Sequence, residues 1–390
     1  MPDFDLSNTL PSDAATAALA GRIWRPDQDG PSVVAVRDNI IVDVSEDFPT
    51  MRDLCEEPDP AGALQDCDGE LVGYIDEVLA NTPPDNRDES QPWLISPIDL
   101  QPIKAAGVTF AASMLERVIE ERAKGSPDAA NAIRSEIGAL LGGNLRKLVP
   151  GSQAAMQLKA RLIEQQMWSQ YLEVGIGPDA EIFTKAPVMS SVGTGADAGL
   201  HPKSSWNNPE PEIVLVVGSD GRIRGVSLGN DVNLRDIEGR SALLLGKAKD
   251  NNASASIGPF LRFFDGAFTL ENVRRMVVSL RVDGADGFVM EGASSMGEIS
   301  RDPLDLVEQT IGASHQYPDG FVLYCGTMFA PVKDRDAVGM GFTHHDGDVE
   351  SVSTPLLGTL TNRMKRSDAC APWEFGIRDL ISNLARRGLI

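Results

Sequence analysis

The sequence is poor in cysteine, histidine and basic residues. Its 390 residues include 4 Cys and 4 His, and 35 Lys and Arg stand against 57 Asp and Glu, for a formal net charge of -22. Cys55, Cys67, Cys325 and Cys370 contain no C-x-x-C pair, so neither a zinc knuckle nor a secreted disulfide framework is indicated. The acidity disfavours nucleic acid and acidic membrane surfaces as partners. We therefore expect reduced thiols, and an anionic substrate would need local help from a metal or a lysine.

Long hydrophobic runs are also absent. No apolar stretch approaches membrane-spanning length, and the first residues, MPDFDLSNTLPSD, are acidic where a signal peptide would be basic and then apolar. The chain is 42% hydrophobic, which is enough to bury one large core or two unequal ones. These features favour a cytoplasmic enzyme that acts on a small molecule.

Three carboxylates are the most informative residues that are present. Glu210 and Glu212 are two apart in a predicted strand, so they point to the same face. The run EIVLVVGSDGRIRGVSLGND reads as a hairpin that turns at Asp220-Gly221. If Ser219 pairs with Arg222, residue numbers across the ladder sum to 441, and Glu210 lies opposite Asp231.

Such a cup of carboxylates requires a counter-charge. Three carboxylates within about 5 Å of one another repel by several kcal/mol, and one takes up a proton unless a cation neutralises them. Oxygen ligands favour Mg²⁺, with Mn²⁺ or Ca²⁺ as possible substitutes.

The order of predicted elements indicates an α+β protein. Residues 32–37 and 40–44 flank the turn signal Asp38-Asn39 and predict a hairpin, and turn-rich loops follow up to about residue 95. We expect a small N-terminal β-containing domain over 1–95 and a catalytic domain over 96–390, with a helical segment at about 108–173 in which Ser152 begins a helix. Short strands without regular crossover helices then predict an antiparallel or mixed β roll or sandwich and disfavour a Rossmann fold.

Several motifs resemble the fumarylacetoacetate hydrolase superfamily. They are PEPEIVLVVG, GVSLGNDVNLRDIEGR, GKAKDNNASASIGPF, YCGTMFAPV and GDVESVSTPLLGTLTN, in that order, and the resemblance covers about residues 175–365. It implies a mixed β roll with a helical insert, a divalent cation, usually Mg²⁺, and assembly as a dimer or tetramer. By resemblance the metal ligands are Glu210, Glu212 and Asp231, the family lysine is Lys247, and the residues lining the substrate pocket are Lys185, Ser190, Gly326 and Thr327.

The same resemblance bears on the reaction. Hydrolases of this superfamily carry a His-x-x-Glu pair before the first pocket strand, and here that stretch reads SQYLEVG, with Gln170 three residues before Glu173. Without an imidazole, water activation for carbon–carbon cleavage is disfavoured. The segment GVTFAASMLER, with Phe110, Ser113 and Arg117, is similar to the 2-keto-3-deoxy-pentonate dehydratases of oxidative pentose degradation.

The resemblance therefore implies a dehydratase that forms 2,5-dioxopentanoate. Metal chelation by the substrate's carboxylate and 2-keto oxygens would acidify the hydrogens on C3. Lys247, Glu181 or Glu173 would remove one of them, and the C4 hydroxyl would leave as water.

Three other functions keep the same motifs. A carbon–carbon hydrolase would be supported by His201 or His315 folding over the metal, and an oxaloacetate-type decarboxylase needs only the metal and a group that stabilises an enolate. A non-enzymatic binding module would have a collapsed carboxylate cup. His344-His345, beside acidic residues, is interpreted as a solvated turn rather than a second metal site.

Overall fold

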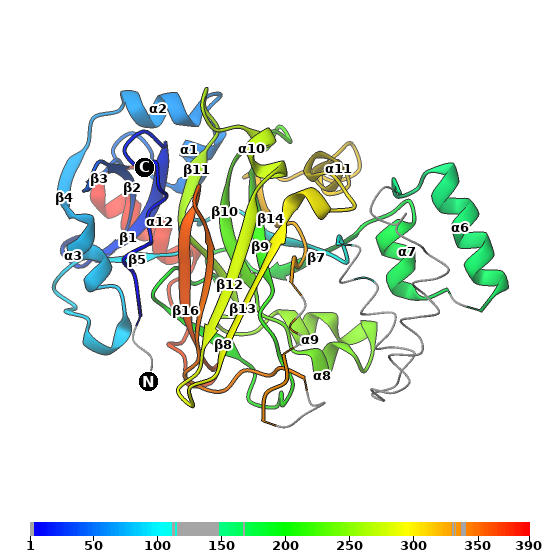
Figure 1. Ribbon diagram of the computed structural model, residues 1–390. Helices are drawn as coiled ribbons and strands as arrows, with labels where there is room; N and C mark the ends of the chain where they lie inside the picture. Colours follow the sequence, from blue (N-terminus) through cyan, green and yellow to red (C-terminus); the bar gives the residue numbers. More distant parts are fainter. Residues whose placement is uncertain are drawn as a thin grey trace.

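Two β-sheets packed face to face form the body of this computed structural model (Figure 1). The structure describes residues 4–110, 114, 148–166, 168–329, 331, 333–336 and 341–390. Within these residues the larger sheet has eleven strands, and β5 (Trp93–Ile95) pairs with β1 beside its main path. The spatial order of the main path is β4 (Glu70–Tyr74), β3 (Ile40–Asp43), β2 (Gly30–Arg37), β1 (Leu19–Arg25), β11 (Ala255–Phe263), β10 (Ile223–Asp231), β9 (Pro211–Val217), β14 (Phe321–Tyr324), β6 (Ile103–Gly107) and β7 (Glu181–Ala186).

The smaller sheet has five strands among the described residues. Their order is β13 (Val289–Ser295), β12 (Val277–Asp283), β15 (Val349–Thr354), β16 (Gly358–Arg366) and β8 (Asp197–Leu200). Both sheets mix parallel and antiparallel pairs, since β14 pairs parallel with β6 and β16 parallel with β8. The predicted α+β class with a mixed β sandwich is confirmed.

Helices surround the sheets and are mostly short. The described α-helices are α1 (Met51–Glu56), α2 (Pro60–Asp66), α3 (Ile75–Ala80), α6 (Gln153–Glu164), α7 (Gln170–Ile176), α8 (Arg235–Glu238), α9 (Leu245–Lys249), α10 (Leu270–Arg274), α11 (Pro303–Glu308) and α12 (Ile377–Arg387). The 3-10 helices are η1 (Pro26–Gln28), η2 (Pro84–Asn86), η4 (Ala242–Leu244) and η5 (Met296–Glu298). Helices α6 and α7 lie at the opposite end of the molecule from the N-terminal strands (Figure 1).

Strand β9 is buried on both faces, which explains its continuous apolar run. Ile213, Leu215 and Val217 pack into the core between the two sheets. Val214 and Val216 point the other way, into a second core that α1 and α2 cover. Because successive side chains along a strand point to opposite faces, the polar residues at the end of β9 also lie alternately on one side of the sheet and the other.

The predicted hairpin of β9 and β10 is present, but its turn is longer than expected. The amide of Gly218 donates to the carbonyl of Arg222 (2.9 Å), so three residues form the loop instead of two. The residue numbers of the paired Val217 and Ile223 therefore sum to 440. A β-bulge before Gly225 restores the predicted sum of 441 for the pairs that follow. The register at the carboxylate end is the one that the sequence predicts.

The structure also bears on the predicted N-terminal hairpin, the predicted helical segment and the predicted domain boundary. β2 and β3 form the hairpin predicted around Asp38-Asn39, and Ser152 caps α6 by accepting a hydrogen bond from the amide of Ala155 (3.2 Å). Much of the helical segment predicted over 108–173 lies outside the described residues. Strand β1 lies before the predicted domain boundary at residue 95 and pairs with β11, which lies after it. The division into two domains at that residue stays a prediction.

Candidate metal centre and its pocket

The carboxyl groups of Glu210, Glu212 and Asp231 meet where β9 begins and β10 ends. One oxygen from each lies within 4.8 Å of the others, and all three residues are buried. The amide of Asp231 donates to the carbonyl of Glu210 (3.0 Å), which places these two residues opposite each other as the hairpin register requires. We refer to the three residues as the carboxylate cup.

Neighbouring polar groups fix the orientation of the cup. Asn233 Nδ2 donates to Glu210 Oε1 (3.0 Å). The amide of Gly326 donates to Glu212 Oε2 (2.6 Å). Gly326 has a φ of +98°, and a Cβ there would lie 2.0 Å from Thr109 Oγ1, so only glycine brings this amide to the carboxylate.

Two buried lysines neutralise part of the cup's charge. Lys249 Nζ pairs with Glu210 and with Asp231 Oδ2, the latter at 2.9 Å. Lys185 Nζ lies 2.9 Å from Asp231 Oδ1. Burial alone would raise the pKa of Asp231, but the two ammonium groups outweigh it and hold that pKa below its usual value.

Glu212 shows that the compensation is incomplete. Burial, followed by the charges of Asp231 and Glu210, raises the pKa of Glu212 well above its ordinary value. Three ionised carboxylates and two ammonium groups leave a net charge of -1, since 3 - 2 = 1. A divalent cation would remove the reason for Glu212 to hold a proton, and its oxygen ligands match this donor set. The residues of the cup therefore fit a metal ion. Within the described part of the chain, they are the one group of three or more acidic, thiol or imidazole side chains that lie close enough together to hold one.

A pocket lies directly over the cup and continues beneath α7. Its walls come from β6, β7, α8 and α9, and it is lined by Ala106, Gly107, Val108, Glu181, Phe183, Glu210, Asp231, Glu238, Leu245, Lys249 and Thr327. An adjoining pocket shares Glu181, Glu238 and Leu245 and adds Gln170, Tyr171, Val174 and Ala242. The two pockets are thus lined by carboxylates and one lysine near the metal centre, and by apolar side chains toward α7.

Glu181 reaches the pocket because its partner in the sheet is a glycine. Gly107 pairs with Glu181 between β6 and β7, and a Cβ on residue 107 would lie 2.0 Å from Glu181 Oε2. The Glu181 carboxylate therefore lies over the bare backbone of β6. Glu181 lines the pocket over the cup, and the catalytic role predicted for it stays a prediction.

Lys247, the predicted family lysine, lies away from the cup. It is exposed, and its Nζ lies 2.8 Å from His201 Nε2. In α9, residues two apart point about 200° from each other, so only one lysine of GKAKD can face the carboxylates. That lysine is Lys249, and the placement predicted for Lys247 is corrected accordingly.

Glu173 also points elsewhere. Its carboxylate accepts hydrogen bonds from Lys159 Nζ (2.5 Å) and Trp168 Nε1 (3.0 Å), and the hydrogen bond from Lys159 is the main cause that lowers its pKa. Gln170 and Val174, on the neighbouring face of α7, line the pocket instead. The catalytic position predicted for Glu173 is therefore replaced by a contact with α6.

The predicted substrate-binding residues separate into three groups. Thr327 lines the pocket, and Gly326 orients Glu212. Lys185 is fully buried and binds the carbonyl of Val232 (3.0 Å) as well as Asp231, so it is a counter-ion of the cup.

The remaining predicted residues are outside the pocket or outside the described chain. Phe110 is buried in the core between the sheets. Ser190 donates to the carbonyl of Pro187 (2.7 Å). Ser113 and Arg117 lie outside the described residues.

Glu238 and Asn233 are functional candidates that the sequence analysis missed. Asn233 Nδ2 donates to Glu238 Oε2 (2.6 Å) and also to Glu210, so one amide connects the pocket wall to the cup. Both residues follow Asp231 in the motif NDVNLRDIEG, where a carboxylate seven residues after a metal ligand was the available signal.

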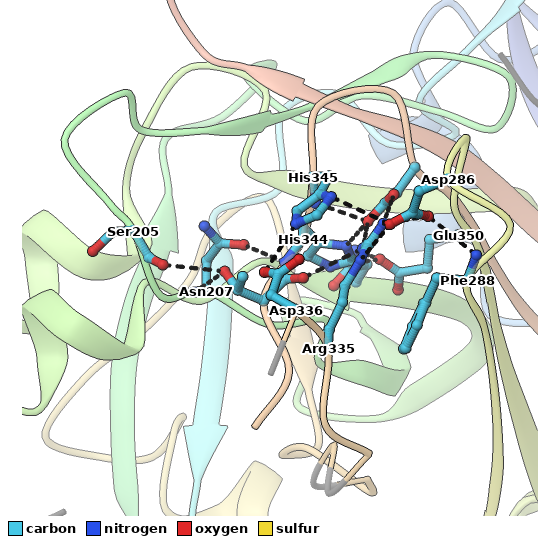
Figure 2. Close-up of polar contacts among 12 residues, drawn as sticks. Ser205, Asn207, Asp286, Phe288, Arg335, Asp336, His344, His345 and Glu350 are labelled. Atoms are coloured by element: carbon cyan, nitrogen blue, oxygen red, sulfur yellow. Dashed lines mark hydrogen bonds and ion pairs between the residues drawn. The ribbon is translucent and has the colours of Figure 1, made fainter. Parts of the chain in front are cut away.

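All four histidines are described, and none lines the two pockets. His201 contacts Lys247, and His315 packs against the ring of Tyr317. His344 and His345 lie in a separate polar cluster with Arg335, Asp286, Asp336, Asp348 and Glu350 (Figure 2). The interpretation of His344-His345 as a solvated turn is wrong for His344, whose ring is buried against Asp348 and Glu350.

Comparisons with known proteins point to one family. Residues 159–365 match the sequence model described as fumarylacetoacetate (FAA) hydrolase C-terminal. A 2-dehydro-3-deoxy-D-arabinonate dehydratase of Saccharolobus solfataricus is 27% identical over 186 residues, which are 48% of this chain and 59% of that protein. A probable 2-keto-3-deoxyxylonate dehydratase of Haloferax volcanii is 28% identical over 204 residues, 52% of this chain and 66% of that protein. The chain thus spans less than two thirds of the length of these relatives.

Solved structures share the fold at low identity. A 2-keto-3-deoxy-D-arabinonate dehydratase complexed with magnesium and 2,5-dioxopentanoate matches with a TM-score of 0.62 and 20% identity, over 89% of this chain and 99% of that chain. A fumarylacetoacetate hydrolase from Exiguobacterium antarcticum matches with a TM-score of 0.53 and 15% identity, over 90% of this chain and 100% of that chain. No helix among the described residues has the length and apolarity needed to cross a bilayer.

Proposed function

Because the chain belongs to the fumarylacetoacetate hydrolase family, we propose that it is a Mg²⁺-dependent dehydratase that converts a 2-keto-3-deoxy-pentonate to 2,5-dioxopentanoate. The observation that carries this proposal is the pocket over the carboxylate cup, which contains Lys249, Glu181 and Glu238 and none of the four histidines. Elimination of water needs a group that takes a proton from carbon and a group that gives one to the departing hydroxyl. A lysine and a carboxyl group can share these tasks.

The metal's contribution follows from the donor set. A divalent cation held by Glu210, Glu212 and Asp231 would polarise the 2-keto group of a bound 2-keto acid and acidify the hydrogens on C3. Mg²⁺ is favoured by the oxygen ligands, with Mn²⁺ or Ca²⁺ as substitutes. The magnesium complex of a protein with the same fold supports this choice.

Lys249 is the residue we assign to the proton on C3. Burial alone would lower the pKa of Lys249, but Asp231 and Glu210 outweigh it and raise the pKa, so the amine is protonated while it neutralises the cup. A cation in the cup would take over that neutralising role and lower the pKa of the amine. Lys249, which lines the pocket, would then be able to act as a free base toward C3 of a bound 2-keto acid.

Glu181 and Glu238 are assigned to the hydroxylated end of the substrate. Both line the two pockets, between the cup and α7. A carboxyl group there can give a proton to the C4 hydroxyl, so that the C3–H and C4–O bonds break, a C3–C4 double bond forms and water leaves. Transfer of a C5 proton to C3, followed by ketonisation of the resulting enol through protonation of C4, gives the C5 aldehyde. Two carboxylates on this wall favour hydroxyl groups and repel a second carboxylate, as in oxaloacetate.

Product analysis by NMR tests the reaction. The protein, treated with EDTA and reloaded with Mg²⁺, is incubated separately with 2-keto-3-deoxy-D-pentonate, acetylpyruvate and oxaloacetate. We expect 2,5-dioxopentanoate from the first and neither pyruvate nor CO₂ from the others. Rapid pyruvate formation from acetylpyruvate, with the pentonate unchanged, would place the protein among the hydrolases. Release of CO₂ from oxaloacetate at a comparable rate would identify a decarboxylase.

Two further properties stay predictions with this function. We expect a dimer or tetramer, which size-exclusion chromatography with light scattering would measure. We also expect the enzyme to act in the cytoplasm.

A further inference from the structure

Asn230 connects the carboxylate cup to the smaller sheet. Its Oδ1 accepts a hydrogen bond from the amide of Glu210 (3.0 Å), and its Nδ2 donates to Glu350 Oε2 (2.8 Å). All three residues are buried, and Glu350 is 120 positions away from Asn230 in sequence. Since Glu210 belongs to the cup, this is a path of two hydrogen bonds from β15 to a candidate metal ligand.

Strand alternation explains why the path exists. Leu228 packs into the core between the sheets, and Asn230, two residues further along β10, points to the same side. Asp231 points to the other side, into the cup. On β15, Glu350 and Val352 face inward in the same way, so Glu350 meets Asn230 between the two sheets.

Glu350 is a polar residue in a place where burial is expensive. Its side chain is 1% exposed, its Oε1 has no hydrogen-bond partner, and His344 Nε2, itself without one, lies 3.6 Å from its Oε2 (Figure 2). A buried carboxyl group with so few partners costs several kcal/mol relative to an apolar residue of similar size. The Glu350 side chain therefore adds little to stability, and the contact with Asn230 is its one direct hydrogen bond in the described chain.

We propose that Glu350 is a positioning residue that holds Glu210 in the carboxylate cup through Asn230. The physical reason is the asymmetry of the Asn230 amide. The amide of Glu210 is a donor, so Asn230 must present its oxygen there, and its nitrogen then needs an acceptor on the other side. Glu350 is that acceptor. If it were lost, rotation of the Asn230 amide would bring two donors together at Glu210 and release the main chain that carries the ligand.

This inference rests on the metal site of the proposed function, but not on the dehydration reaction. Outer partners of metal ligands typically contribute 10-fold to 100-fold in metal affinity. The test therefore measures metal binding directly, by titrating Mn²⁺ into EDTA-treated protein in a calorimeter, and records the melting temperature of the metal-free protein alongside.

Three variants separate positioning from stability. Glu350→Met removes the acceptor while keeping the volume, and we expect the Kd for Mn²⁺ to rise 10-fold to 100-fold. Glu350→Gln keeps a carbonyl oxygen for Asn230, so its Kd should stay within threefold of the wild-type value. Val352→Ala, on the same face of β15, should lower the melting temperature and leave the Kd unchanged.

A double variant tests the path itself and covers poor folding of Glu350→Met. Asn230→Ser removes both hydrogen bonds and should weaken Mn²⁺ binding by a similar factor, and adding Glu350→Met to it should cause no further loss. A wild-type Kd in Glu350→Met, or in Asn230→Ser if the former does not fold, would overturn the inference. So would an additive loss in the double variant. If Mn²⁺ binding responds as expected while the pentonate is not dehydrated, the inference stands and the proposed reaction fails.

Discussion

Two groups of charged residues, the carboxylate cup and a cluster around Arg335, are balanced in different ways. In the carboxylate cup, Glu210, Glu212 and Asp231 converge on two lysines, and the pKa of Glu212 is raised by burial and by the neighbouring carboxylates. A second group is centred on Arg335. There the deeply buried carboxylate, Asp348, is paired directly with a guanidinium group.

The Arg335 cluster consists of Arg335, Asp286 and His344, which Figure 2 shows, together with Asp348, which pairs with Arg335 and His344. The guanidinium binds Asp348 through two hydrogen bonds (2.5 and 2.9 Å) and Asp286 through Nη2 (3.0 Å). Burial would raise the pKa of Asp348, but hydrogen bonds from His344 and Arg335 outweigh it and lower the pKa to about 2.

The difference separates a binding site from a structural one. Both groups bury a carboxylate, but a fork of N–H donors binds both oxygens of Asp348, whereas within the described residues the hydrogen bond to Glu212 comes from a backbone amide. A centre that is short of positive charge can bind a cation. A carboxylate bound by a guanidinium fork, such as Asp348, holds the fold together, in this case the loop that precedes β15.

The largest expected effect is the loss of metal from the cup. Asp231→Asn keeps the shape and removes one charge, so Mg²⁺ affinity should fall and kcat/KM should drop on the order of 10³-fold, since the lost metal contribution is several kcal/mol. Calorimetry and the NMR assay measure the two quantities. Asp348→Asn is the matched control, and its metal affinity should stay within threefold of wild type. An active Asp231→Asn enzyme with normal metal content would contradict the assignment.

The two lysines of α9 give a second contrast. Lys249→Met should reduce turnover by about 10²-fold to 10⁴-fold, because a proton-transfer group is lost. It should also tighten Mg²⁺ binding, since the ammonium group no longer competes for Glu210 and Asp231. Lys247→Met, on the exposed side, should change neither quantity by more than threefold. Steady-state kinetics measures turnover, and calorimetry measures Mg²⁺ affinity. Equal losses of turnover in both variants would refute the assignment of proton transfer to Lys249 and not to Lys247.

Breaking the Arg335 cluster should affect stability instead of activity. Arg335→Met leaves Asp348 buried without its partner, and we expect the free energy of unfolding to fall by about 3–5 kcal/mol. Arg281 pairs with Asp283 and Glu291 but is half-exposed, so Arg281→Met should cost at most about 1 kcal/mol. Urea titration of the metal-free proteins compares them. Equal losses would mean that the cluster is no more than a surface ion pair.

The smallest effect concerns pH. Burial, partly offset by the hydrogen bond from Asn230, raises the pKa of Glu350 to about 8, so the folded protein keeps a proton that the unfolded chain has already released near its ordinary value of 4.5. Stability from this group is therefore lost as the pH rises through about 8, with a slope of at most about 1.4 kcal/mol per pH unit.

Glu350→Gln should remove that slope. Between pH 7 and 8 the variant should lose less stability than wild type in urea titrations. His344, whose pKa is lowered by burial, and Asp348, with a pKa of about 2, do not titrate in this interval. Glu212 remains in both proteins, so the difference between them isolates Glu350. Parallel pH profiles would show that Glu350 is ionised at neutral pH.

Local spacing in the sequence determined the carboxylate cup. Alternation places Glu210 and Glu212 on one face, and the hairpin register brings Asp231 opposite Glu210 although the turn itself was predicted one residue too short. The register survived because a strand buried on both faces tolerates only one alignment, and a bulge absorbed the extra loop residue. Gln170, at the position where the hydrolases of the family carry a histidine, lines the pocket, and this substitution could be identified in the sequence only through the family resemblance.

Tertiary packing decided which other residues surround the cup. The letters GKAKD offer two equivalent lysines, and only the rotation of α9 against β7 and β10 selects Lys249. Glu173 pairs with Lys159 outside the pocket, whereas Glu238 lines the pocket and accepts a hydrogen bond from Asn233. The contact between Asn230 and Glu350 joins two sheets across 120 residues of sequence. Such contacts depend on how helices and sheets are oriented when they pack, and the periodicity of a single strand or helix carries no information about that orientation.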